Sequence, residues 1–304
     1  MAANVLYEST PAAFGEKLNS AQLSAATFGA SNGSTFAAGP LLIIAGAGTG
    51  KTNTLAHRVA HLLLNGVAAE RILLLTFTRR AAQEMLRRAE RIIAETLRAA
   101  SKNAAVSANA ARQLWSGTYH SIGNRLLREY AHVVGLEASF SVLDRGDAAD
   151  LLDLLRQELG LAKKDKRFPR KDACLAIYSH RVNSQLSLKR TLDESFPWCS
   201  DWTDELTQLY RRYVEVKHAQ RLLDYDDLLL YWRLLVQEPR LTREIGDRFD
   251  HVLIDEYQDA NTLQAQIVHA MKPDGAGVCV VGDDAQAIYS FRAASIENIL
   301  TFPE

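Results

Sequence analysis

Residues 45–52 read AGAGTGKT, follow the apolar run 41–44 and precede a stretch with helical periodicity. Glycine permits backbone angles that other residues avoid, so several N–H groups can turn toward phosphate oxygens. A helix starting behind such a loop adds its partial positive charge. A strand, a glycine-rich turn and a helix in this order predict a P-loop, in which Lys51 reaches the β- and γ-phosphates and the Thr52 hydroxyl holds Mg²⁺. We expect these residues to contact the nucleotide: Ala45, Gly46, Ala47, Gly48, Thr49, Gly50, Lys51, Thr52 and Asn53.

Two adjacent carboxylates, Asp255 and Glu256, end a second apolar run at residues 252–254. Neighbouring side chains on a strand face opposite ways, but the chain can curl where the strand ends, so both acids can reach one pocket. Asp255 suits Mg²⁺ bound through a water, and Glu256 suits polarising the water that attacks the γ-phosphate. Unpaired charge is costly to bury, which argues against a purely structural role for the two acids.

Several polar and aromatic residues are candidates for contacts with a nucleotide or with bases. After the last apolar run, Gln286 could sense the γ-phosphate, and Tyr289 and Phe291 offer flat faces for stacking. Phe77 is expected in the core, with base stacking as the alternative. Gln22 could present its amide to an adenine edge, although its position in the sequence does not by itself distinguish it from a surface glutamine.

Short apolar runs and helical patterns alternate at both ends of the chain. Buried strands are expected at residues 41–44, 72–78 and 252–254, each followed by a helical stretch, which predicts an α/β protein with a parallel sheet. Residues 140–216 are expected to be mostly helical. Residues 29–40 are rich in glycine and serine, so we expect a loop leading into the P-loop strand.

The chain has 304 residues and a net charge of −1, which allows two domains and requires any nucleic-acid surface to be a local patch. The basic residues 163–171 are interpreted as a solvated loop in preference to a phosphate-contacting patch. The three scattered cysteines form no CxxC pair, which argues against a zinc site or a disulfide framework. No apolar run approaches membrane-spanning length, so we expect a cytoplasmic protein without a membrane partner.

Seven segments form a longer ordered pattern, and they read LNSAQ, AGAGTGKT, LTFTRRAAQEM, GTYHSIGNRLL, LDYDDLL, VLIDEYQDAN and VVGDDAQAIYSFRAASIENI. Together they resemble the UvrD/Rep/PcrA-type superfamily 1 DNA helicases. The resemblance runs from about Leu18 to the last residues. VLIDEYQD and VGDDAQAIYSFRAA are far more specific than a P-loop, which many unrelated NTPases share.

The resemblance implies roles for individual residues. It gives adenine recognition to Gln22, makes Glu256 the catalytic carboxylate, and has Gln286 couple the γ-phosphate to the DNA site. Arg292 matches an arginine that links its segment to the active-site acids. The residues that would hold phosphates and Mg²⁺ are Gly50, Lys51, Thr52 and Asp255. Those that would stack on bases or line the DNA path are Phe77, Tyr289, Phe291, Thr76, Thr118 and His120.

Some positions depart from the family pattern. Ala45 stands where a glycine is usual, and Asn53 stands where an arginine is frequent, so a charge beside the nucleotide is missing. Arg79 and Arg80 replace an Asn-Lys pair and keep positive charge. Phe291 replaces a common tryptophan and gives a smaller stacking face.

The family's organisation implies a RecA-like domain 1A at residues 1–90 and 218–304, with a mainly helical domain 1B inserted at residues 91–217. Family members continue into a second motor domain that supplies arginine fingers. We therefore expect this chain to be an N-terminal fragment with weak or no turnover of its own. The expected parent activity is ATP- and Mg²⁺-dependent movement, 3′ to 5′, on single-stranded DNA and duplex junctions in repair or replication.

Two alternatives stay open. One is a helicase subunit of a RecB/AddA-type helicase–nuclease, whose front end shares these motifs and which a downstream nuclease domain would identify. The other is a nucleotide-binding module without motor activity. The presence of Lys51, Thr52, Asp255, Glu256 and Gln286 argues against the second alternative for the parent protein.

Overall fold

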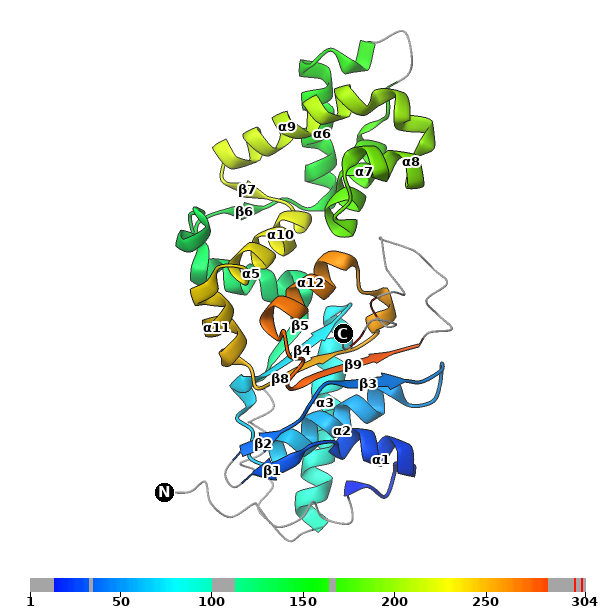
Figure 1. The fold of residues 1–304 in the computed structure, drawn as a ribbon, viewed down its shortest axis with the longest axis vertical. Coiled ribbons are helices and arrows are strands. Elements are labelled where there is room, and N and C mark those ends of the chain that lie inside the picture. The colour runs from blue at the N-terminus through cyan, green and yellow to red at the C-terminus, as the bar shows by residue number, and fades with distance from the viewer. Residues whose placement is uncertain are drawn as a thin grey trace.

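The computed structural model describes residues 14–32, 35–99, 113–163 and 168–283, together with two single residues, 298 and 302. Its centre is a five-stranded sheet in the order β3-β9-β8-β4-β5 (Figure 1). Every neighbouring pair in this sheet is parallel. The strands are β3 Leu41–Ile44, β4 Ile72–Thr76, β5 Trp115–Thr118, β8 His251–Ile254 and β9 Val278–Gly282. The expected α/β class with a parallel sheet is confirmed.

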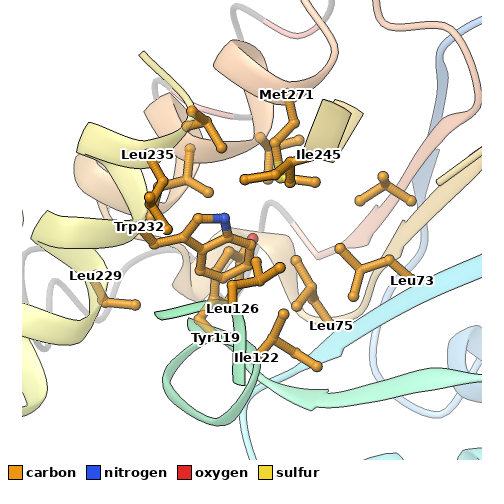
Figure 2. Packing of buried hydrophobic residues seen from close by; sticks show 14 of the residues in the cluster. Leu73, Leu75, Tyr119, Ile122, Leu126, Leu229, Trp232, Leu235, Ile245 and Met271 are labelled. Atoms are coloured by element: carbon orange, nitrogen blue, oxygen red, sulfur yellow. The ribbon is translucent and has the colours of Figure 1, made fainter. Parts of the chain in front are cut away.

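Helices cover both faces of this sheet, which is why its central strands β9, β8 and β4 are buried along their whole length and mostly apolar. Alternate residues of β4 point to opposite faces: Leu73 and Leu75 join one buried cluster, and Leu74 joins the other. Around Trp232, the first cluster packs apolar side chains of the helices against the strand leucines (Figure 2). The helices on that face are α5 Tyr119–Tyr130, α10 Tyr225–Leu235, α11 Pro239–Arg248 and α12 Thr262–Met271, and those on the other are α2 Lys51–Leu64 and α3 Arg79–Ala99.

A second group of helices lies beyond the sheet, at the top of Figure 1, and buries a separate apolar cluster of its own. It contains α6 Arg145–Glu158, α7 Lys171–Ser184, α8 Leu188–Ser195 and α9 Thr203–Ala219. Among the described residues, one further α-helix is α1 Ser20–Thr27. The two-residue strands β6 Ser141–Val142 and β7 Leu222–Leu223 pair in parallel where the chain enters and leaves this group. None of the described helices combines the length and apolar character needed to cross a membrane.

The structure bears on three expectations from the sequence. The segment expected as a loop contains an antiparallel pair, β1 Ala30–Asn32 and β2 Thr35–Ala37, because Phe36 is buried against α2. The boundary expected after residue 90 falls inside α3, which continues to Ala99, and the following strand β5 pairs with β4 in the sheet. In the basic segment, Phe168 is buried in the helical cluster, so at least this residue is not part of a solvated loop.

A buried ion-pair group joins α9 to the start of α10. Lys217 is only 2% exposed, and its Nζ lies 2.6 Å from Asp224 Oδ2 and 2.5 Å from Asp227 Oδ2. Asp224 and Asp227 also form a capping box at the start of α10. Burial alone would lower the pKa of Lys217, but the two carboxylates raise it above its ordinary value. Lys217 is therefore charged and neutralises two buried acids.

Replacing Lys217 by methionine leaves two buried carboxylates without a counter-charge. We expect Lys217→Met to lower the free energy of unfolding by about 3–5 kcal/mol in urea titrations followed by circular dichroism. Arg190→Met is the control, because Arg190 forms an exposed pair with Glu194 on one helix, where such pairs contribute about 0.3–0.5 kcal/mol. Equal losses in the two variants would contradict the prediction.

Candidate functional site

The loop between β3 and α2 has the backbone geometry that a P-loop requires. The Ala45 N–H donates to the carbonyl of Gly282 at 3.0 Å, which fixes the start of the loop to the end of β9. Gly48 and Gly50 have φ of +74° and +87°, in the left-handed region that favours glycine. No side chain among the described residues caps the N-terminus of α2. Its first N–H groups are therefore available to an anion.

The side chain of Lys51, at the first position of α2, is buried between two acids. Its Nζ lies 3.4 Å from Asp283 Oδ2 and 3.6 Å from Glu256 Oε2. The two acids follow β9 and β8, and parallel strands bring their carboxyl ends to the same edge of the sheet. The sequence identified Lys51 and Glu256, but not Asp283 as the second partner. A phosphate entering the loop would compete with these carboxylates for the ammonium group.

Asp255 follows β8 directly and is buried. Its Oδ1 has no hydrogen-bond partner among the described residues. Burial and the neighbouring charge of Glu256 raise the pKa of Asp255 to about 6. A buried carboxylate oxygen without a partner fits a bound cation or its water shell, and Mg²⁺ prefers oxygen ligands. Asp255 and the Thr52 hydroxyl, on the helix that follows the P-loop, are a donor set of the kind Mg²⁺ takes.

Glu256 has a strained backbone and a braced side chain. Its φ is +52°, a left-handed conformation that is uncommon outside glycine and costs of the order of 1–3 kcal/mol. This turn is the curl expected at the end of the strand. The Gln258 amide donates to Glu256 Oε2 at 2.7 Å and accepts from the Asp283 N–H at 3.0 Å. Gln258 thus holds Glu256 against the end of β9, a role that the sequence pattern does not reveal.

Gln22 lies against the P-loop, as a nucleotide-contacting residue must. Its Nε2 donates to the carbonyl of Thr49 at 2.7 Å, and its Oε1 accepts from the N–H of Asn19 at 2.9 Å. Asn19 is the N-cap of α1. The contact of Gln22 with adenine stays a prediction.

Arg58 of α2 fixes the other end of α1. Its guanidinium is buried and donates to the carbonyl of Phe28 at 2.6 Å, with Ala25 and Ala26 carbonyls at 3.4 Å. Cations at a helix C-terminus interact favourably with its partial negative charge. Sequence reasoning missed Arg58, because only the fold brings α1 beside α2.

The residues expected along the DNA path end two neighbouring strands. Thr76 ends β4 and is the register partner of Thr118, which ends β5 and caps α5. The His120 ring lies 5.6 Å from that of Tyr225 in an edge-to-face contact, and Tyr225 is 45% exposed. Phe77, immediately after β4, is half-buried, so its side chain is neither fully in the core nor fully exposed to solvent. Tyr225 is an additional candidate for base contact, and the aromatic residue inside LDYDDLL is the signal that could have found it.

Four expected site residues lie outside the described residues, and they are Gln286, Tyr289, Phe291 and Arg292. Their expected roles stay predictions.

Comparison with known proteins identifies the family of this chain. Residues 27–304 match the profile of the UvrD/REP helicase N-terminal domain. The chain belongs to the UvrD/Rep helicase family. The resemblance inferred from the order of the motifs is confirmed, and the parallel sheet with its P-loop is the corresponding RecA-like domain of the UvrD/Rep family.

Relatives in the UvrD/Rep family are similar over most of this chain. The ATP-dependent DNA helicase PcrA of Staphylococcus epidermidis is 33% identical over 271 residues, covering 88% of the chain and 34% of that protein. The ATP-dependent DNA helicase UvrD1 of Mycobacterium tuberculosis is 35% identical over 275 residues, covering 86% and 33%. DNA helicase II of Haemophilus influenzae is 34% identical over 267 residues, covering 86% and 34%. The chain thus spans about a third of the length of these relatives.

A substitution at Gly50 tests the geometry of the P-loop. A Cβ at Gly50 would lie 3.0 Å from Gln22 Nε2, in a left-handed backbone that already disfavours side chains. We expect Gly50→Ala to weaken the binding of Mg·ATP at least about tenfold, a loss of 1.4 kcal/mol or more, measured by titration calorimetry.

Gly135→Ala is the matched control for this test. Gly135 has φ of +70°, but nothing lies within 4 Å of the position of its Cβ. Both variants should lose similar thermal stability, and only Gly50→Ala should lose affinity. Unchanged affinity in Gly50→Ala would show that the loop does not hold the nucleotide as described.

Proposed function

We propose that this chain is the nucleotide-binding and DNA-contacting part of an ATP-dependent DNA helicase that moves along single-stranded DNA. The observation that carries the proposal is the convergence of Lys51, Asp255 and Glu256 beside a P-loop at the carboxyl edge of a parallel sheet. The names of the relatives, ATP-dependent DNA helicases, support the same function.

Each residue of the site has its own role in ATP hydrolysis. Lys51 exchanges its contacts with Glu256 and Asp283 for the phosphates. This exchange leaves Glu256 free to accept a proton from the attacking water, while Gln258 keeps its carboxylate oriented. The N–H groups at the start of α2 and the buried Asp255 complete the site. Mg²⁺, when bound, neutralises charge that develops on the phosphates.

DNA contacts are assigned to the same edge of the sheet. Thr76 and Thr118 end adjacent strands there, and Tyr225 and His120 offer aromatic rings beside them. Stacking on such rings tolerates any base, which suits movement along a strand of arbitrary sequence. From the family resemblance, the proposed direction is 3′ to 5′, the proposed substrates include duplex junctions, and the proposed setting is repair or replication.

The domain organisation is part of the proposal. The sheet and the helices on its two faces form domain 1A, and α6 to α9, with their own apolar cluster, form the inserted domain 1B. A second motor domain is the proposed partner that supplies arginine fingers, because such residues raise phosphoryl-transfer rates by several orders of magnitude. Its contribution accords with relatives of which this chain covers about a third.

Removing the charge of Glu256 separates binding from turnover. In the intact protein we expect Glu256→Gln to keep its affinity for Mg·ATP but to lower DNA-stimulated turnover by about 10²–10⁴-fold, because the general base is lost. Lys51→Ala should instead lose affinity. Phosphate release is measured with and without single-stranded DNA.

Glu70→Gln is the control, because it makes the same chemical change at an exposed position of the 3₁₀ helix Ala69–Arg71, which precedes β4 at the opposite edge of the sheet. Turnover that ignores DNA, or that survives Glu256→Gln, would contradict the proposed function. If residues 1–304 alone turned over ATP as fast as the intact protein, the requirement for a second motor domain would be wrong.

A further inference from the structure

Three buried polar side chains form a hydrogen-bonded chain between three helices. Asn261, the N-cap of α12, donates through Nδ2 to Asn183 Oδ1 on α7 at 2.9 Å. Asn183 donates through its own Nδ2 to Asp226 Oδ1 on α10 at 2.7 Å. All three residues are less than a tenth exposed. This hydrogen-bonded chain of side chains links α7, in the second group of helices, to α10 and α12.

Stability does not explain this arrangement. Burial and the nearby charge of Asp224 raise the pKa of Asp226 to about 6, so the fold holds this carboxyl group at a cost. Well-packed apolar residues of similar volume are often as stable as buried polar groups. Hydrogen bonds differ from apolar contacts in that they fix direction and register. The polar chain therefore fixes the relative placement of α7, α10 and α12.

The two ends of the polar chain lie beside the two candidate binding sites. Asn261 closes the short loop that begins at Glu256 and runs through the 3₁₀ helix Tyr257–Asp259. Asp226 directly follows Tyr225, whose ring contacts His120 on the expected DNA path. A displacement of the loop would thus reach the aromatic pair through two hydrogen bonds and two short backbone segments.

We propose that Asn261, Asn183 and Asp226 are positioning residues that couple nucleotide binding at Lys51 and Glu256 to DNA binding at Tyr225 and His120. This inference rests on the proposed function. A nucleotide that draws Lys51 away from Glu256 removes the ion pair at the start of the loop that ends at Asn261. The polar chain passes that change to α7 and to the start of α10. By linkage, DNA held at Tyr225 changes the affinity for nucleotide by the same factor.

Asn261→Asp breaks the hydrogen-bonded chain of side chains but keeps the N-cap of α12. The aspartate oxygen still accepts from the Gln264 N–H, as Asn261 Oδ1 does at 2.9 Å. The donor to Asn183 is lost, and two oxygens face each other instead. The affinity of a fluorescent oligo(dT) is measured with and without a non-hydrolysable Mg·ATP analogue, and the ratio is the coupling factor. We expect each affinity alone to stay within about twofold, and the coupling factor to move toward one by about two- to thirtyfold.

Reversing the direction of the hydrogen bonds between residues 261, 183 and 226 should restore the coupling between the two binding sites. In the double variant Asn261→Asp, Asp226→Asn, the Asn183 amide turns over, donates to the new aspartate and accepts from the new asparagine. It gives up its present hydrogen bond to the Ser179 carbonyl, which lies 2.8 Å away. Asp144→Ala is the stability control, because it removes the side-chain cap of α6 outside the polar chain. It should lower the melting temperature and leave the coupling factor unchanged. A defect that is purely one of stability would also be seen in this control and would not be rescued by the reversal.

The outcomes separate the inference from the proposed function. If both ligands bind and the coupling factor of the native chain is one, or is unchanged by Asn261→Asp, or is not restored by the double variant, the inference is wrong and the proposed function stands. If the native chain binds neither ligand, the proposed function fails and the inference fails with it.

Discussion

The buried ammonium group of Lys51 is the interaction on which the site depends. A charge removed from water requires an opposite charge nearby, and here Glu256 and Asp283 provide it. Both acids can reach Lys51 only because β8 and β9 are adjacent and parallel, so their carboxyl ends share one edge. The glycines of the P-loop let the chain turn from β3 into α2 over that edge. The order of the strands thus determines where the two acids lie, and the P-loop determines where Lys51 meets them. A nucleotide phosphate can replace the carboxylates because it satisfies the same need for negative charge.

The sequence predicts those parts of the site whose signals are local. The glycine spacing before Lys51 and the apolar run before Asp255 each specify a strand and its polar end without reference to the rest of the chain. The structure places Thr76 and Thr118 as register partners at the ends of adjacent strands, and their contact with DNA stays a prediction. The strands before Ala45 and Asp255 are found where the sequence predicts them, and the parallel sheet brings their polar ends to one edge.

Features that depend on contacts between distant segments were missed or misplaced. The strand β5 has only four residues, two of them Ser116 and Gly117. The ring centroid of its buried Trp115 lies 3.4 Å from Cζ of Arg125 and 4.3 Å from Cζ of Arg248. Nothing in the segment itself indicates that it belongs to the central sheet, and the family's organisation placed it in the helical insertion. Arg58 and Gln258 likewise gain their roles only when α1 lies beside α2 and β9 beside β8. Their partners are distant in the sequence or belong to the backbone, which no spacing rule can specify.

The start of α10 shows how one local pattern can serve three purposes. Asp224 and Asp227 cap the helix and neutralise Lys217, Tyr225 projects to the surface beside His120, and Asp226 is turned inward to Asn183. Sequence reasoning reaches the capping role, because capping depends on neighbours three residues away. The other two roles follow from the helical periodicity, which turns successive side chains of one segment toward different neighbours.

The loop between Glu256 and Asn261 is under constraint from both sides. At its start, the Asp255 N–H donates to the carbonyl of Leu75 at 3.0 Å, and Glu256 is held in a left-handed turn by Gln258. At its end, Asn261 is fixed by the cap of α12 and by Asn183. The segment from Glu256 to Asn261 is short and fixed at both ends, so the strained backbone of Glu256 has few ways to relax. Any relaxation therefore displaces either the strand edge that faces the phosphates or the helix end that leads to the DNA path. That geometry makes the loop a natural place for the two binding sites to influence each other.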